Sequence, residues 1–83
     1  MMTDLIIRLF KDNQSDPETT ITIPGKVLTV ASKLIPKRAT EALQEKGIDI
    51  NELIELSKKP DVKGTIIEVE EHKKKEKIII ALE

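Results

Sequence analysis

The spacing of apolar residues changes twice along this chain, and this change limits the possible folds more than any other feature. In the middle, apolar residues recur every three to four positions, which predicts helices. Towards both ends lie short runs rich in β-branched residues, which predict strands. The four runs are Leu5–Lys11, Thr19–Pro24, Thr65–Glu70 and Lys77–Leu82.

Polar stretches join the strands of each pair, so each pair predicts a hairpin. The chain is therefore expected to be a single α+β domain over residues 1–83, in the order ββ-α(α)α-ββ. Its three parts are a hairpin over 5–24, a helical segment over 26–59 and a second hairpin over 64–82.

The first helix is predicted from one apolar stripe that ends before Pro36. Pro36 either stops this helix or begins the next one, because proline is tolerated in the first turn. Gly47 is expected to end the second helix in a left-handed conformation. The stripe consists of Val27, Leu28, Ala31, Leu34 and Ile35.

The last helix has the strongest local signals. Asp49 is a predicted N-cap, and Glu52 follows at the spacing of a capping box. Ile48 and Leu53 flank the cap as a hydrophobic staple does. Pro60 is expected to end this helix.

Alternation along the strands divides their side chains between the two faces of the sheet. One helical layer would cover the wholly apolar sides, which leaves several apolar residues on the back of the sheet. The first and last strands are apolar on both sides, and such strands usually lie centrally. This predicts a mostly antiparallel four-stranded sheet of order 2-1-4-3. The apolar residues left on the back are Ile6, Phe10, Ile66, Ile79 and Ala81.

These five residues are the candidate interface. The chain has 83 residues and no cysteine, so its core is small and no disulfide supports it. Burial of the back face between two copies would add stability. Two other readings together have the same weight as this one: the third helix or a terminus folds over the face, or the residues are simply exposed.

The sequence holds no recognisable catalytic, cofactor-binding or metal-binding set. His72 is the only histidine and has no cysteine near it. A metal site or a catalytic dyad needs a second ligand or an orienting partner. The expectation is therefore a protein that is not an enzyme and has no cofactor.

The charges are nearly balanced, with 14 basic and 15 acidic residues. Lys73, Lys74, Lys75 and Lys77 form a basic cluster, but glutamates bracket it and the chain lacks Trp and Tyr. Nucleic-acid binding through this turn is therefore the weaker alternative. No apolar run is long enough for a membrane span or a signal sequence, so a cytoplasmic protein is expected.

Three segments carry a resemblance to a known family. They read TITIPGKVLTVASKLIP, EKGIDINELIEL and KGTIIEVEEHKKKEKIIIALE. Together they resemble a SHOCT-like small domain of bacterial proteins, found alone or beside the helical module of LiaX/YvlB-type envelope-stress proteins. The resemblance implies the fold and a bacterial source, and it implies no reaction.

Two functions follow as hypotheses. The first is a protein-interaction module, most simply a homodimer joined through the back of the sheet. The second is a monomeric domain that binds a small ligand or acts in regulation. Its pocket between helices and sheet would be lined by Leu9, Leu28, Leu34 and Ile80.

Overall fold

The structure is a computed structural model that describes residues 3–12, 14–59 and 61–83, apart from the side chains of residues 29, 31 and 32. All four predicted strands are present, with ends within one residue of the prediction. Pro60, the predicted helix stop, lies outside the described residues, as does the side chain of Ala31. The elements are β1 (Leu5–Lys11), β2 (Thr19–Ile23), the 3-10 turn η1 (Gly25–Val27), α1 (Leu28–Ala31), the 3-10 turn η2 (Ser32–Leu34), α2 (Lys37–Glu45), α3 (Ile50–Ser57), β3 (Gly64–Glu71) and β4 (Glu76–Leu82).

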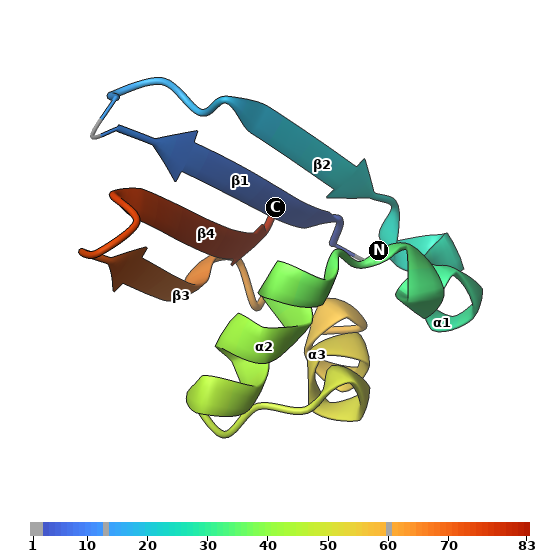
Figure 1. The fold of residues 1–83 in the computed structure, drawn as a ribbon. Helices are drawn as coiled ribbons and strands as arrows, with labels where there is room; N and C mark the ends of the chain where they lie inside the picture. The colour runs from blue at the N-terminus through green and yellow to red at the C-terminus, as the bar shows by residue number, and fades with distance from the viewer. Residues whose placement is uncertain (1–2, 13, 60) are drawn as a thin grey trace.

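The strands form one antiparallel sheet of order β2-β1-β4-β3, which confirms the predicted order and fold class (Figure 1). β1 and β4 pair along their whole lengths at the centre. They are the two strands with apolar residues on both sides, and a central strand exposes neither of its edges to water. The first and last strands of the chain therefore hold the sheet together.

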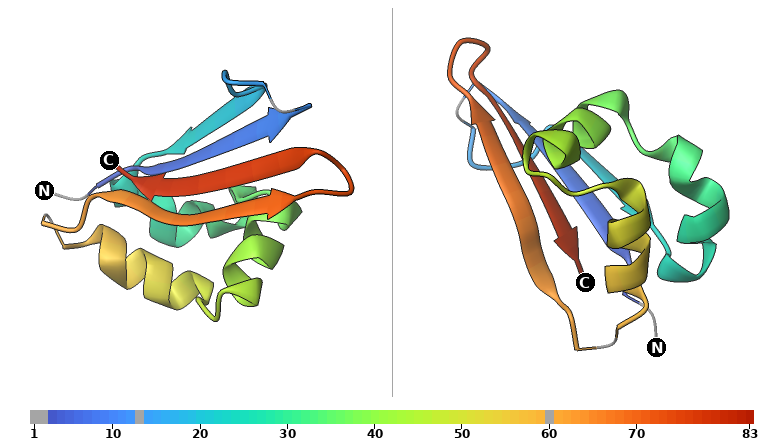
Figure 2. Two further views of the ribbon diagram at one scale, coloured as in Figure 1. Left: turned by 90° about the vertical axis from the view of Figure 1, so that its left-hand side faces the viewer. Right: turned by 90° about the horizontal axis from the view of Figure 1, so that it is seen from below.

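All helices lie on one face of this sheet, and no helix or strand of the described chain covers the other face (Figure 2). The inward side chains of the sheet pack against the apolar faces of the helices as predicted. The buried core consists of Leu5, Ile7, Ile23, Leu28, Ile35, Ala39, Ala42, Leu43, Leu53, Ile54, Ile67, Ile78, Ile80 and Leu82.

The end of α2 follows the predicted glycine. Gly47 has φ +75°, the left-handed conformation that favours glycine. Its N–H donates to the carbonyl of Gln44, and the N–H of Ile48 donates to the carbonyl of Leu43 at 2.9 Å. These two bonds form a Schellman motif, which ends the helix and turns the chain towards α3.

The beginning of α3 follows the predicted cap. The Asp49 carboxylate accepts a hydrogen bond from the backbone N–H of Glu52 at 2.9 Å. Leu53 is fully buried and Ile48 is half-buried against the core. Local sequence signals thus place the α2–α3 corner correctly.

The segment before Pro36 differs from the prediction. It is a 3-10 turn, one turn of α-helix and another 3-10 turn, rather than one amphipathic helix. A 3-10 turn advances the chain by three residues per turn, so later side chains rotate away from a stripe spaced for 3.6 residues. Leu28 and Ile35 remain buried, but Leu34 is 71% exposed. Pro36 is the N-cap residue of α2 and has extended backbone angles.

Candidate functional site

The helix-free face is a grid of side chains set by the strand register. β1 and β4 provide its two central columns, and β2 and β3 provide the outer ones. The first row is Thr22, Ile6, Ala81 and Thr65, the second is Thr20, Arg8, Ile79 and Glu68, and the third is Phe10, Lys77 and Glu70.

Four of the five predicted interface residues lie in this grid, on the central strands. Ile6, Phe10 and Ala81 are 9%, 8% and 2% exposed, yet none of them belongs to the core cluster under the helices. Ile79 lies between them in the register and is half-buried. The face therefore carries a second apolar patch, separate from the main core; we call these four residues the back patch.

Ile66, the fifth predicted residue, does not follow the alternation. The pairing of β3 with β4 shifts between Thr65 and Ile67, so Ile66 faces no partner residue on β4. A bulge of this kind redirects the side chain at the extra residue. Ile66 packs against the core cluster, and Thr65 occupies the place opposite Ala81.

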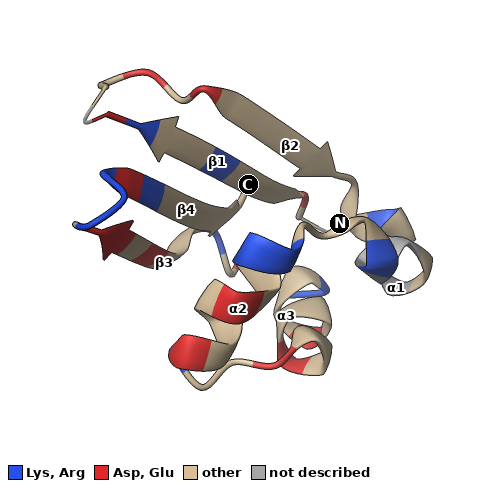
Figure 3. Ribbon diagram, viewed as in Figure 1, with Lys and Arg blue, Asp and Glu red and all other residues tan. Residues whose placement is uncertain are grey.

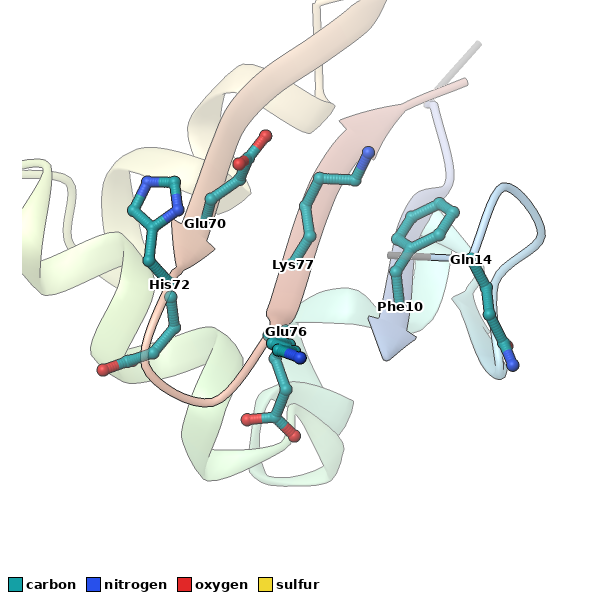
Figure 4. A pocket seen from close by; sticks show the side chains of 8 residues that line it. Phe10, Gln14, Glu70, His72, Glu76 and Lys77 are labelled. Atoms are coloured by element: carbon teal, nitrogen blue, oxygen red, sulfur yellow. The ribbon is translucent and has the colours of Figure 1, made fainter. Parts of the chain in front are cut away.

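Long charged side chains account for part of the shielding of the back patch. The ammonium group of Lys77 lies 4.6 Å from the centre of the Phe10 ring, a cation–π contact. Figure 4 shows Lys77 between Phe10 and Glu70, which flank it in the strand register. In the next row, Arg8 donates to the carboxylate of Glu83 at 2.9 Å. Such side chains cover apolar surface with their stems while their charges stay in water.

A hollow of about 300 Å³ lies beside this contact, where the two hairpin turns meet (Figure 4). His72 lines it from the exposed turn between β3 and β4. The lining mixes both signs of charge, with Glu70 and Glu71 near Lys75 and Lys77. Within the described ranges, no group of three or more His, Cys, Asp or Glu side chains is placed to hold a metal ion.

An ion pair ties the second hairpin to the helical layer. The guanidinium of Arg38, in α2, donates to the carboxylate of Glu76, in β4, at 2.6 Å. This hydrogen bond lowers the pKa of Glu76, and burial only partly offsets the effect. The pair is a structural link between α2 and the sheet.

The predicted ligand pocket between helices and sheet is not formed by its four residues. Leu28 and Ile80 have no exposed surface and lie within the packed core. Leu34 points away from it and is 71% exposed, because the 3-10 turn rotates it outwards. This cavity was therefore predicted wrongly, and the cause is the helical period assumed for residues 26–35.

Two further observations concern nucleic acid and the membrane as partners of this chain. The lysines of the β3–β4 turn are exposed, and acidic residues of β3 lie beside them (Figure 3). Nucleic-acid binding there stays a prediction. In the part of the chain that the structure describes, no helix has both the length and the apolar composition needed to cross a bilayer.

A four-stranded antiparallel sheet with helices on one face and an apolar patch on the other defines a small α+β domain. The chain belongs to the YvlB-like family: the model for the C-terminal domain of YvlB-like proteins matches residues 5–81. This confirms the YvlB part of the resemblance, while the SHOCT-like designation and the LiaX context stay predictions. The family is not a known enzyme family. No curated protein and no solved structure matches the chain.

Proposed function

We propose that this YvlB-like domain is a non-enzymatic interaction module that self-associates through the back patch. One observation carries the proposal. Ile6, Phe10, Ile79 and Ala81 gather on a sheet face that no helix or strand of the described chain covers. A solvated antiparallel face usually carries polar residues, so an apolar patch there favours contact with another protein surface.

The size of the face determines how strong such contact can be. Four strands about 4.8 Å apart and seven residues rising about 3.3 Å each give an area of about 440 Å² per copy. Stable interfaces bury about 800 Å² per partner. The proposed dimer is therefore weak and reversible, and it forms as the protein concentration rises.

The charged side chains that shield the back patch must move or take part in the interface when a second copy binds. A second copy packed on this face displaces Lys77 from the Phe10 ring or repeats the cation–π contact across the interface. Ile79 has more accessible surface than its three neighbours and lies at the centre of the grid. Centrally placed apolar residues contribute most to interfaces, so Ile79 is expected to matter most.

The test is molar mass in solution by size exclusion with light scattering, over about a hundredfold dilution. Refractive index provides detection, because the chain has no Trp or Tyr. Ile79→Thr keeps the β-branched shape and removes apolar surface. Val30→Thr makes the same kind of change at a side chain that is 82% exposed on another surface, and serves as the control.

We expect a mass that falls from dimer to monomer on dilution for the natural chain and for Val30→Thr. The Ile79→Thr protein should be monomeric throughout, with circular dichroism showing that it is folded. A natural chain that is monomeric at every concentration, or a dimer that Ile79→Thr leaves unchanged, would overturn the proposal. Phe10→Glu is a poorer probe because Phe10 is 8% exposed and its replacement is expected to unfold the sheet.

A further inference from the structure

A second apolar surface, separate from the back patch, lies on the segment between β2 and α2. Val30 is 82% exposed and Leu34 is 71% exposed, and they are the large apolar side chains most open to solvent in the described chain. The neighbouring Leu28 and Ile35 are buried in the core. One side of the segment is therefore anchored in the core, and its other side presents aliphatic groups to solvent.

The charged residues near these two side chains along the segment are all basic. Lys26, Lys33 and Lys37 are exposed and stand three to four residues from Val30 or Leu34. No Asp or Glu occurs in residues 19–40, although acidic residues outnumber basic ones over the whole chain, 15 to 14. Figure 3 shows lysine on the α1 region and no acidic residue there.

The segment also projects from the molecule. Figures 1 and 2 show it at one corner, beyond the end of β2 and apart from α2 and α3. Its start is held by Asp4, whose carboxylate accepts a hydrogen bond from the N–H of Gly25 at 3.1 Å. Val30 and Leu34 are thus presented on a folded, convex corner before any partner arrives.

We propose that residues 25–37 form a docking element for an anionic lipid surface. Val30 and Leu34 enter the boundary between headgroups and acyl chains, while Lys26, Lys33 and Lys37 contact lipid phosphates. Aliphatic groups flanked by lysine at an exposed corner are typical of reversible interfacial binding. The charge of the segment is complementary to an anionic surface, and the rest of the chain does not share this charge.

The shape and composition favour lipid over other partners. A convex corner needs no complementary groove on a fluid lipid surface, whereas a protein partner must provide one. Single-stranded nucleic acid is bound by aromatic platforms, and the segment has no aromatic residue. The duplex backbone is contacted by polar and basic groups, and two exposed aliphatic groups would add little there.

The experiment is sedimentation of the full chain with phosphatidylcholine vesicles, prepared with and without phosphatidylglycerol. One variant pair removes the apolar groups, Val30→Ser with Leu34→Ser. A second pair, Lys26→Gln with Lys33→Gln, removes two charges from the docking element. The matched control, Lys73→Gln with Lys74→Gln, removes two charges from the exposed turn between β3 and β4.

We expect binding to the anionic vesicles only, weakened by salt. Both variant pairs in the docking element should reduce the partition coefficient at least about tenfold. Each lysine near an anionic surface contributes about fivefold, and burial of one aliphatic side chain contributes about tenfold or more. The control should bind within about twofold of the natural chain. All variants change exposed residues, so their melting temperatures should match.

Three results would overturn the proposal. The first is no binding to anionic vesicles at low salt. The second is an equal loss of binding in the turn control, which would indicate diffuse charge rather than a docking element. The third is a loss of self-association, instead of lipid binding, when Val30 and Leu34 are replaced, which would assign the corner to a second copy.

Discussion

Arg38 and Glu76 show how single residues connect parts of this molecule that are distant in sequence. Glu76 begins β4, at the end of the lysine-rich turn, and Arg38 lies in the first turn of α2. Several lysines lie closer to Glu76 along the sequence than Arg38 does. The fold selects Arg38, because α2 crosses the sheet beside β4 and brings the guanidinium within 2.6 Å of the carboxylate.

The first prediction concerns the pH dependence of this pair. The pKa of Glu76 lies below its ordinary value of 4.5 in the folded state. The stabilisation that the ion pair provides is therefore present above pH 4.5, and it is lost as the pH falls through the lowered pKa of Glu76. Arg38→Gln should lower the free energy of unfolding at neutral pH, and its difference from the natural chain should vanish in acid.

Urea unfolding followed by circular dichroism, at several pH values between neutral and acid, measures this difference. Lys58→Gln is the control, because the Lys58–Glu55 pair is more exposed on both sides and spans only one helical turn. A difference between natural chain and Arg38→Gln that stays constant with pH would contradict the assigned role of the pair.

At the scale of elements, the segment from η1 to η2 behaves differently from α2 and α3. α3 is stabilised by its own cap and α2 by its Schellman motif, so local sequence predicts both. The η1–α1–η2 segment has ten residues between Pro24 and Ile35, and no helix as long as α2 forms there. Its conformation depends on which side chains the core accepts, namely Leu28 and Ile35.

The second prediction compares two leucines of this segment. Leu28 has no exposed surface and Leu34 is 71% exposed. Leu28→Ala should destabilise the domain by about 2–5 kcal/mol, because it leaves a cavity in the core. Leu34→Ala should change stability by less than about 0.5 kcal/mol, as surface substitutions usually do.

Thermal unfolding of the two variants provides the comparison, and each serves as the other's control. Equal destabilisation by both substitutions would mean that the segment is the continuous amphipathic helix predicted from its apolar stripe. That outcome would also remove the exposed corner on which the lipid-docking proposal depends.

At the scale of the whole molecule, the first and last strands meet at the centre of the sheet. β1 and β4 pair along their lengths, and the backbone of Asp4 exchanges two hydrogen bonds with that of Glu83. Thr3 reaches α3 as well, through bonds from its N–H and hydroxyl to the carbonyl of Ser57. The sheet is therefore complete only when the last strand is in place.

The third prediction follows from this arrangement. A chain that ends at Ile79 lacks Ile80 and Leu82, which are fully buried in β4. We expect it to lose cooperative thermal unfolding, because the burial of each such side chain contributes about 1.5–3 kcal/mol and small domains have little stability to spare. A chain that ends at Leu82 loses only Glu83 and should remain folded with a lower melting temperature.

Circular dichroism over a temperature ramp distinguishes the two truncated chains. A cooperative transition in the chain that ends at Ile79 would show that the domain folds without the last part of β4, which carries Ile80 and Leu82. The expectation that the sheet needs the whole length of β4 would then be wrong.

The sequence by itself determined the strands, the fold class, the strand order and the α2–α3 corner. These features rest on short-range patterns: alternation, β-branched runs, Gly47 and the Asp49 cap. The strand order followed from β1 and β4 being apolar on both faces, since such strands need cover on both sides. The back patch was located in the same way, apart from Ile66, which the bulge moved to the core side.

Only the tertiary structure decided which side chains the core accepts and which it leaves outside. Four features depend on neighbours that are distant in sequence. They are the outward rotation of Leu34, the bulge at Ile66, the ion pair of Arg38 with Glu76, and the cover of Phe10 by Lys77. Packing energy overrides weak local preferences at such positions. For this reason the exposure of Leu34, and with it the corner that it shares with Val30, could not be found from the periodicity of the sequence.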